Sequence, residues 1–231
     1  GLCLGRVALA SNKLSRAEQH FQQSAADFPW RLEPLLELWL LQTLQGFDKK
    51  AVLTARRAVE LLAGGSCEWG QYNNVDMALL FNGKHWPGCR GQLAAEHIAT
   101  LLHTKSLRRC RLWEQAYDSL SAIQLQDEMD LAAGVFAFQK AKISICHSED
   151  LLRQSVRTTA DADVTSGSVC TGSDLPMVAS IRVLLQRAAH HLDLFRKHIC
   201  SDVDARRAAG YQTRLGACID TVERQWPTDG W

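Results

Sequence analysis

Two stretches near the start of the chain repeat one pattern of small and aromatic residues, and this repeat constrains the fold more than any other feature. The first stretch contains Leu4, Gly5, Ala8, Ala17, Phe21 and Pro29, and the second contains Leu38, Gly46, Ala51, Ala55 and Ala58. Ala17 and Ala51 stand 34 positions apart (51 − 17 = 34). A fixed period of this length is typical of stacked helix–turn–helix units. The sequence therefore predicts helical hairpins that pack side by side.

The first unit reads as two helices joined by a tight turn. We expect helices over residues 2–13 and 16–27, the second of which ends before Pro29 because a residue that precedes proline avoids the helical conformation. Asn12 lies in the turn and tolerates the left-handed backbone conformation better than most residues. Ser15, with an acidic residue three positions later, has the spacing of a capping box for the second helix.

The second unit is expected to pair helices over residues 33–44 and 49–62. Gly46 begins the turn between these helices, and the Asp48 carboxylate can cap the second of them. Two glycines at positions 64 and 65 are expected to end that helix. Both units therefore have the length and the turn chemistry of a helical hairpin.

Beyond residue 62 the pattern becomes less regular. Glycines, prolines and tryptophans predict an irregular segment over residues 64–91. Further helices are expected over residues 92–105, 112–123, 127–146 and 149–157, and over the longer spans 175–200 and 205–225. Small polar residues over 159–174 predict a flexible loop. The expected domains are helical repeats over residues 1–158, this loop over residues 159–174, and a long helical hairpin over residues 175–226.

The pattern resembles the tetratricopeptide repeat (TPR) family, most clearly over residues 1–62 and less completely over residues 92–124. In the later stretch, the string WEQAYDSLSAI places Ala116 in the small-residue position of the repeat. The resemblance implies an all-α, TPR-like solenoid of helical hairpins whose first helices line a concave groove. The longer hairpin over residues 175–226 is then a cap at the end of the solenoid.

TPR proteins act as scaffolds, so the resemblance implies binding of another protein and no catalysis. It also implies that Arg6 of the first hairpin faces the groove, together with Leu36, Leu40 and Thr43 of the second. Each leucine left in water forgoes about 1.5–3 kcal/mol of burial, so we expect such a surface to be covered. The expected cover is a peptide, helix or subunit of a partner within a larger assembly. The alternatives are the chain's own later helices and a second copy of the chain.

Two further groups of residues are candidates for contacts with a partner. Trp69 and Trp86 lie in the irregular segment, and tryptophan is enriched at the centres of protein interfaces. A basic cluster at a helix end also complements the helix dipole. The cluster consists of Lys105, Arg108, Arg109 and Arg111. The alternative function is therefore a helical-repeat nucleic-acid-binding module whose Lys105–Arg111 cluster contacts phosphates.

The amino-acid composition argues against several classes of function. Lys and Arg total 26 and Asp and Glu total 25, so the chain lacks the overall basic excess typical of nucleic-acid-binding domains. The eight cysteines are scattered and include no CxxC pair, which predicts reduced thiols in the cytoplasm or nucleus. The sequence contains no signal peptide and no apolar run long enough to suggest a membrane span, so we expect no membrane partner.

The sequence carries no recognisable pattern for catalysis, cofactor binding or metal binding. GxSxG, HExxH and phosphate-binding glycine loops are absent. His191 and His198 share a helix face but lack the i, i+4 spacing of a metal-binding pair. We therefore expect no enzyme activity, no cofactor and no metal. The chain begins without a methionine and inside an expected helix, which suggests a piece of a longer protein.

Overall fold

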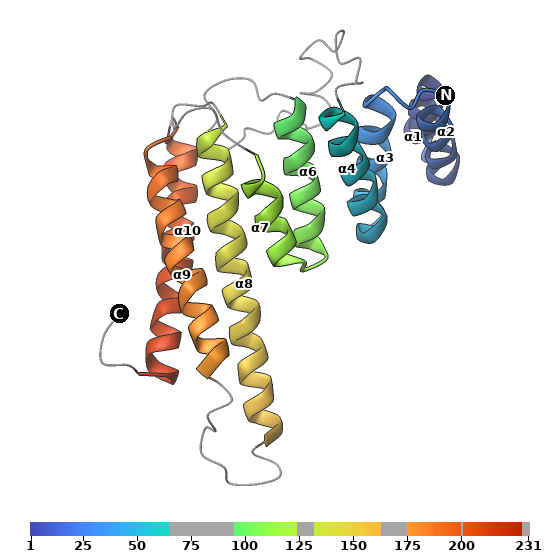
Figure 1. The fold of residues 1–231 in the computed structure, drawn as a ribbon. Helices are drawn as coiled ribbons and strands as arrows, with labels where there is room; N and C mark the ends of the chain where they lie inside the picture. Colours follow the sequence, from blue (N-terminus) through green and yellow to red (C-terminus); the bar gives the residue numbers. More distant parts are fainter. Residues whose placement is uncertain (65–94, 124–131, 163–174, 200, 228–231) are drawn as a thin grey trace. The chain divides into compact units, whose positions relative to one another are not determined.

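The computed structural model describes residues 1–64, 95–123, 132–162, 175–199 and 201–227, and every regular element within them is an α-helix. The expected all-α class is therefore confirmed for these residues. The helices fall into two compact units (Figure 1). The first unit contains α1 (Leu2–Ala10), α2 (Leu14–Asp27), α3 (Glu33–Leu44), α4 (Asp48–Ala63), α6 (Ala95–Arg109) and α7 (Trp113–Ser121). The second contains α8 (Ala133–Ala162), α9 (Leu175–Arg196) and α10 (Asp202–Gln225).

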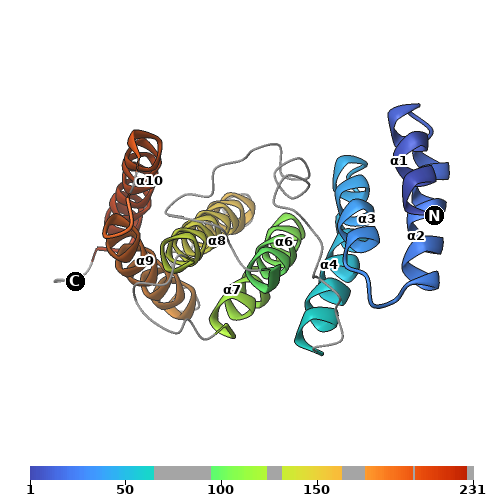
Figure 2. The ribbon, with the colours of Figure 1, turned by 90° about the horizontal axis from the view of Figure 1, so that it is seen from above.

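The helices of the first unit form three hairpins, α1–α2, α3–α4 and α6–α7. The two helices of each hairpin pack against each other. Successive hairpins also pack in chain order, because α2 contacts α3 and α4 contacts α6 (Figure 2). The first unit is therefore a row of helical hairpins, each in contact with its neighbour.

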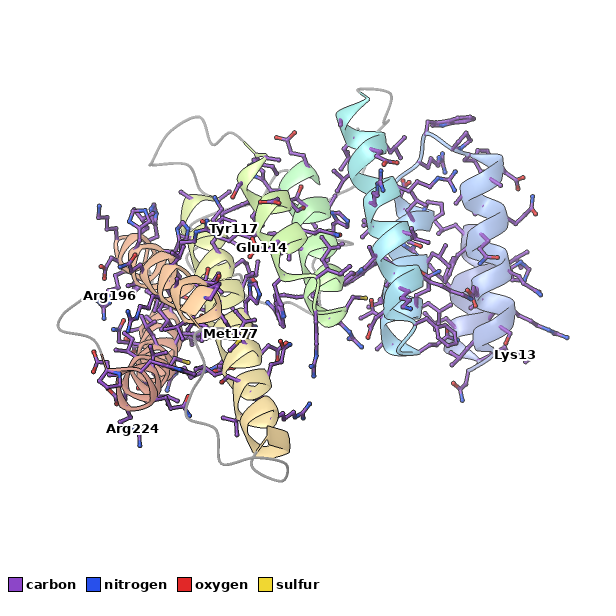
Figure 3. All side chains as sticks on the ribbon, turned by 60° about the horizontal axis from the view of Figure 1, so that its bottom comes forward. Lys13, Glu114, Tyr117, Met177, Arg196 and Arg224 are labelled. Atoms are coloured by element: carbon purple, nitrogen blue, oxygen red, sulfur yellow. The ribbon has the colours of Figure 1, made fainter. Side chains whose placement is uncertain are left out.

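The same turn joins the two helices of all three hairpins. Asn12, Gly46 and Arg111 have positive φ angles of 56°, 77° and 59°, respectively. The next residue in each turn donates its backbone N–H to the carbonyl oxygen five residues earlier, as Lys13 does to Ala8 at 2.8 Å. Figure 3 labels Lys13, which lies directly before α2. The hydrogen bond of each turn pairs a carbonyl that the end of a helix would otherwise leave without a partner. The expected left-handed turn residue at Asn12 is therefore confirmed, and the third hairpin repeats it.

Two expected helix caps are wrong. The N-cap residues of α2 and α4 are Lys13 and Phe47, and neither makes a side-chain capping hydrogen bond. Ser15 and Asp48 instead lie inside the first turns of their helices. The physical reason is the turn, because the left-handed residue directs the chain into the second helix before either polar side chain is reached. Asp48 still complements the positive end of the α4 dipole.

Small residues allow the helices of the first hairpin to approach closely. A Cβ atom added to Gly5 would lie 2.3 Å from Cε1 of Phe21, so only glycine fits there. Phe21 is fully buried and packs with Ala17 and with Leu38 and Leu41 of α3. Phe21 therefore fills the space between the first two hairpins, as the repeat pattern predicts.

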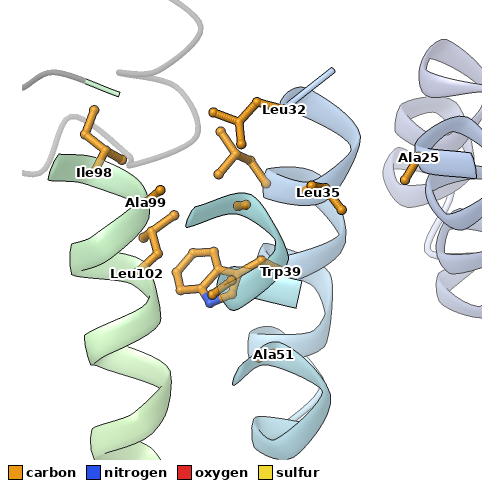
Figure 4. Close-up of a cluster of buried hydrophobic side chains, with 11 residues drawn as sticks. Ala25, Leu32, Leu35, Trp39, Ala51, Ile98, Ala99 and Leu102 are labelled. Carbon is orange, nitrogen blue, oxygen red and sulfur yellow. The ribbon is translucent and has the colours of Figure 1, made fainter. Parts of the chain in front are cut away.

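Helix α3 lies at the centre of the first unit, and ten of its twelve residues are buried. Its Trp39 packs in a cluster with Ala51 of α4 and Leu102 of α6 (Figure 4). The Trp39 Nε1–H donates a buried hydrogen bond of 2.8 Å to Oγ of Ser106. These contacts attach the third hairpin to the second.

The second unit is a bundle of three longer helices. Helix α8 packs mainly against α9, and both also contact α10. The Phe138 ring lies 4.8 Å from the Phe195 ring and 5.1 Å from the Tyr211 ring, measured between centroids, which joins all three helices in one aromatic cluster. Ser201 caps α10, because its Oγ accepts the backbone N–H of Asp204 at 3.1 Å.

The expected elements of this half differ from the structure in two respects. The sequence predicts separate helices over residues 127–146 and 149–157, but α8 continues through His147 and Ser148. The buried Ser148 hydroxyl donates to the backbone carbonyl of Ser144 at 2.9 Å, so this polar residue is satisfied within the helix and does not end it. Helix α8 also extends to residue 162, so the first part of the expected loop is helical.

The boundary between the units also differs from the expected one at residue 158. Because α8 shares its core with α9 and α10, residues 175–226 belong to a three-helix unit and do not form a separate hairpin. The rest of the expected loop, residues 163–174, lies outside the described residues. So does the irregular segment from residue 65 onward.

Candidate protein-interaction surfaces

The three hairpins place their first helices in one register. Ala17, Ala51 and Ala116 are the buried alanines that follow the three turns. Arg6, Leu40 and Lys105 each stand eleven residues before the alanine of their own hairpin (17 − 6, 51 − 40 and 116 − 105). Helices α1, α3 and α6 therefore carry these side chains at equivalent positions. We call this surface the first-helix face, defined by Arg6, Leu40, Leu44, Lys105, Arg108 and Arg109.

Of the leucines on α3, the structure leaves only Leu40 and Leu44 within reach of a partner. Leu36 and Thr43 are buried, and Leu36 packs in a cluster that includes Ile98 of α6. The alternative in which later helices cover the apolar surface therefore applies to Leu36, because α6 packs against it. Leu40 is partly buried, whereas Leu44 is 70% exposed.

Arg6 lies at one side of this surface and is held by an ion pair. Its Nε lies 2.6 Å from Oε1 of Glu37, a buried carboxylate on α3. The pair joins the first helices of the first two hairpins. Removing Arg6 would leave the Glu37 carboxylate buried without this partner, which is costly. Arg6 therefore both stabilises the hairpin contact and presents a partly exposed cation on the first-helix face.

The basic cluster lies on the other side, and two of its cations make contacts with the second hairpin. The Lys105 ammonium lies 5.3 Å from the centroid of the Trp39 ring, a cation–π contact. The Arg109 Nε lies 2.5 Å from Oδ1 of Asp48 on α4. The structure thus places Leu40 on α3 and Lys105 on α6 at equivalent positions, whereas Leu36 and Thr43 are buried. The contacts of Lys105 and Arg109 with the second hairpin also engage part of the positive charge of the basic cluster.

Two histidines, one in each unit, have lowered pKa values. Burial lowers the pKa of His103 on α6, and the nearby Arg56 lowers it further. Burial likewise lowers the pKa of His191 on α9 to about 4, with smaller contributions from the charges of Lys140, His190 and Arg187. Among the described residues, no group of three or more His, Cys, Asp or Glu side chains could hold a metal ion.

One aromatic group was not selected from the sequence as a contact surface. Phe28 and Trp30 are both partly exposed between α2 and α3, and their rings meet edge to face at 5.8 Å. The Arg31 guanidinium lies 5.4 Å from the centroid of the Phe28 ring. The signal in the sequence is the string FPWR. The two tryptophans that the sequence did favour, Trp69 and Trp86, lie outside the described residues.

No protein-family model, curated protein or solved structure matches this chain significantly. Across the part of the chain that the structure describes, no helix is both long and apolar enough to cross a membrane.

Proposed function

We propose that the chain is a non-catalytic scaffold of TPR-like helical hairpins that binds a partner protein through the first-helix face. The observation that carries this proposal is the exposure of Leu44 at the end of an otherwise buried helix. Together with the partly buried Leu40, it forms an apolar strip on α3. The equivalent positions on the neighbouring helices carry Arg6 and Lys105. An apolar strip between cations suits an amphipathic peptide or helix, or a subunit surface, that has acidic residues beside its apolar ones.

The setting we propose is a larger assembly in the cytoplasm or nucleus. The thiols of Cys3, Cys110, Cys146 and Cys218 are free, which is consistent with a reducing compartment. Covering Leu44 would regain about 1.5–3 kcal/mol of burial, a useful but not sufficient part of a specific interface. A partner must therefore also contact the flanking cations.

The nucleic-acid alternative has weaker support. Arg109 is paired with Asp48, and Lys105 lies over Trp39, so both cations already make contacts inside the first unit. Phosphate binding would have to compete with these contacts. The two functions differ in salt dependence, because the affinity of a protein that contacts several phosphates falls steeply as salt is added.

A pair of matched leucine variants tests the proposal. Partners are first isolated with the wild-type chain by cross-linking and identified by mass spectrometry, and their affinity is then measured by calorimetry. Leu44→Asp should weaken binding at least tenfold, about 1.4 kcal/mol, because it places a charge in the apolar strip. Leu53→Asp is the control, since Leu53 is 67% exposed but lies on α4. It should change the affinity by less than about twofold.

Several outcomes would contradict the proposal. Equal effects of the two variants would show that the first-helix face is not the binding surface. A steep loss of affinity with added salt for a bound oligonucleotide would favour the nucleic-acid alternative. Self-association would appear as a solution mass above that of one chain, and Leu44→Asp would abolish it if a second copy covers this face.

A further inference from the structure

A groove lies between α8 and α10 in the second unit and encloses a volume of about 530 Å³. Its floor is formed by Leu152 and Val156 of α8 and by Ala217, Cys218 and Thr221 of α10. Leu152 and Cys218 are buried, whereas Val156 is 51% exposed. The groove exists because α8 packs mainly against α9 and makes fewer contacts with α10. Its floor is therefore largely apolar and only partly covered by the chain.

The groove runs along single faces of both helices. On α8 its lining extends from Glu149 to Arg157, and on α10 it extends from Arg214 to Thr221. At a rise of 1.5 Å per residue, the α8 side is about 12 Å long, or roughly two helical turns. This length fits a partner helix that inserts apolar side chains at spacings of three and four residues.

The charges around the groove are mainly positive. Three arginines line it, Arg153, Arg157 and Arg214, against the single carboxylate of Glu149. That carboxylate is occupied, because Nε and Nη2 of Arg214 donate to its two oxygens at 2.9 and 2.7 Å. Arg214 is also held over the Tyr211 ring at 4.9 Å. The Arg214–Glu149 pair therefore neutralises itself. Arg153 shares its charge with Asp150, so the exposed Arg157 contributes most of the net positive charge of the groove.

These two arginines lie where a partner could reach them. Arg153 contacts Asp150 at 3.2 Å and Glu149 at 3.7 Å, yet most of its side chain is exposed. Arg157, one turn further along α8, is exposed. The exposed part of the groove thus combines an apolar residue, Val156, with two guanidinium groups.

We propose that this groove binds an amphipathic helix of a partner protein, with apolar residues placed over Val156 and acidic residues facing Arg153 and Arg157. Charge complementarity selects an acidic partner, and the two-turn apolar floor selects a helix over an extended strand. The site is separate from the first-helix face and does not depend on the function proposed for that face. The chain would then hold two partners, or two parts of one partner.

Two synthetic peptides test the charge preference on the full chain. The first is a fluorescein-labelled helical peptide of about 18 residues, with leucines at i, i+3 and i+7 and glutamates on both sides of that stripe. The second carries lysine in place of every glutamate. By fluorescence anisotropy, the glutamate peptide should bind with a Kd below about 100 μM and the lysine peptide at least tenfold more weakly.

Variants of the chain test the location. Val156→Asp and Arg157→Glu should each weaken binding of the glutamate peptide at least tenfold. Val183→Asp is the apolar control, because Val183 is 46% exposed on α9. Arg206→Glu, an exposed position near the start of α10, is the charge control. Both controls should keep the affinity within about twofold, as should Leu44→Asp, which separates this groove from the first-helix face.

The proposal is overturned if the glutamate peptide does not bind at about 1 mM, or if the lysine peptide binds equally well. It is also overturned if the control variants weaken binding as much as the groove variants do. A single-stranded RNA that displaces the glutamate peptide, with an affinity that falls steeply with salt, would assign the arginines to phosphate binding instead. Hydrogen exchange supports the site if the glutamate peptide slows exchange in residues 149–157 and 214–221, and contradicts it if the protection lies elsewhere.

Discussion

The two units of this chain form their cores in different ways. In the first unit, short helices approach closely because alanine or glycine stands at the contacts, as Gly5 does against Phe21. In the second unit, α8, α9 and α10 have 30, 22 and 24 residues and share clusters of larger side chains such as Ile181, Leu185 and Phe195. The first unit therefore depends on small residues at a few close contacts, and the second on long, continuous helix interfaces.

The two units should therefore respond differently to a destabilising substitution. Contacts in the first unit run between hairpins that are neighbours in the chain, so a defect in one hairpin should have local effects, as in repeat proteins. In the second unit α9 contacts both other helices, so a defect in its core should affect all three.

Phe195→Ala should have the largest effect. The ring is fully buried and packs against Phe138, so its loss should cost about 3–5 kcal/mol of unfolding free energy through lost burial and a cavity. Because α9 joins the other two helices, hydrogen exchange should accelerate in α8, α9 and α10 together. Native-state exchange read by mass spectrometry measures this. Acceleration confined to α9 would show that the second unit is as local in its response as a repeat.

Gly5→Ala is the corresponding change in the first unit and should have a smaller effect. The added methyl group overlaps the buried Phe21 ring, which should cost about 1–3 kcal/mol. The faster exchange should stay within α1 and α2 and leave α6 and α7 protected. Gly210→Ala is the control, because a Cβ there meets nothing within 4 Å. It should stabilise α10 by about 0.5–1 kcal/mol through helix propensity. Loss of protection throughout the first unit would contradict the local response.

The sequence predicted the first unit better than the second, because its signals are local. A residue with a left-handed backbone conformation stands five positions before a small residue and fixes the turn of the hairpin through contacts with its near neighbours. Gly46 and Ala51 have this spacing, and Asn12 is the corresponding turn residue of the first hairpin. The bounds predicted for α3 are confirmed. The break predicted between residues 146 and 149 is wrong, because α8 is continuous there and the Ser148 hydroxyl forms its hydrogen bond within the helix.

The candidate surfaces were only partly predictable. The repeat register correctly places Arg6 and Leu40 on first helices, but it cannot show that neighbouring helices bury Leu36 and Thr43. The groove between α8 and α10 was missed because it depends on how two helices far apart in sequence are spaced. Its one signal in the sequence is the alternation of apolar residues and arginines from Leu152 to Arg157, which also fits an ordinary solvent-facing helix.

The smallest predicted effect is a loss of stability of the second unit in acid, which we attribute to a single side chain, His191. The pKa of His191 is about 4 in the folded chain and about 6.5 in the unfolded chain. Burial is the main cause of the lower value, and the nearby charges of Lys140, His190 and Arg187 add to it. A lowered pKa means that the unfolded chain binds the proton more readily. The contribution of His191 to stability is therefore complete above pH 6.5 and is lost as the pH falls towards 4.

Because His191 is only partly buried, we expect this loss to be about 1–2 kcal/mol. Urea denaturation between pH 7 and pH 4, followed by hydrogen exchange in α8–α10, measures the loss. His191→Gln removes the titrating group, so the variant should lose less stability than the wild-type chain over this range. Exchange in the first unit measures how far its half-buried His103, whose pKa is lowered in the same direction, adds to the acid response. An equal acid response in wild type and variant would show that His191 is not the source of the acid sensitivity of the second unit.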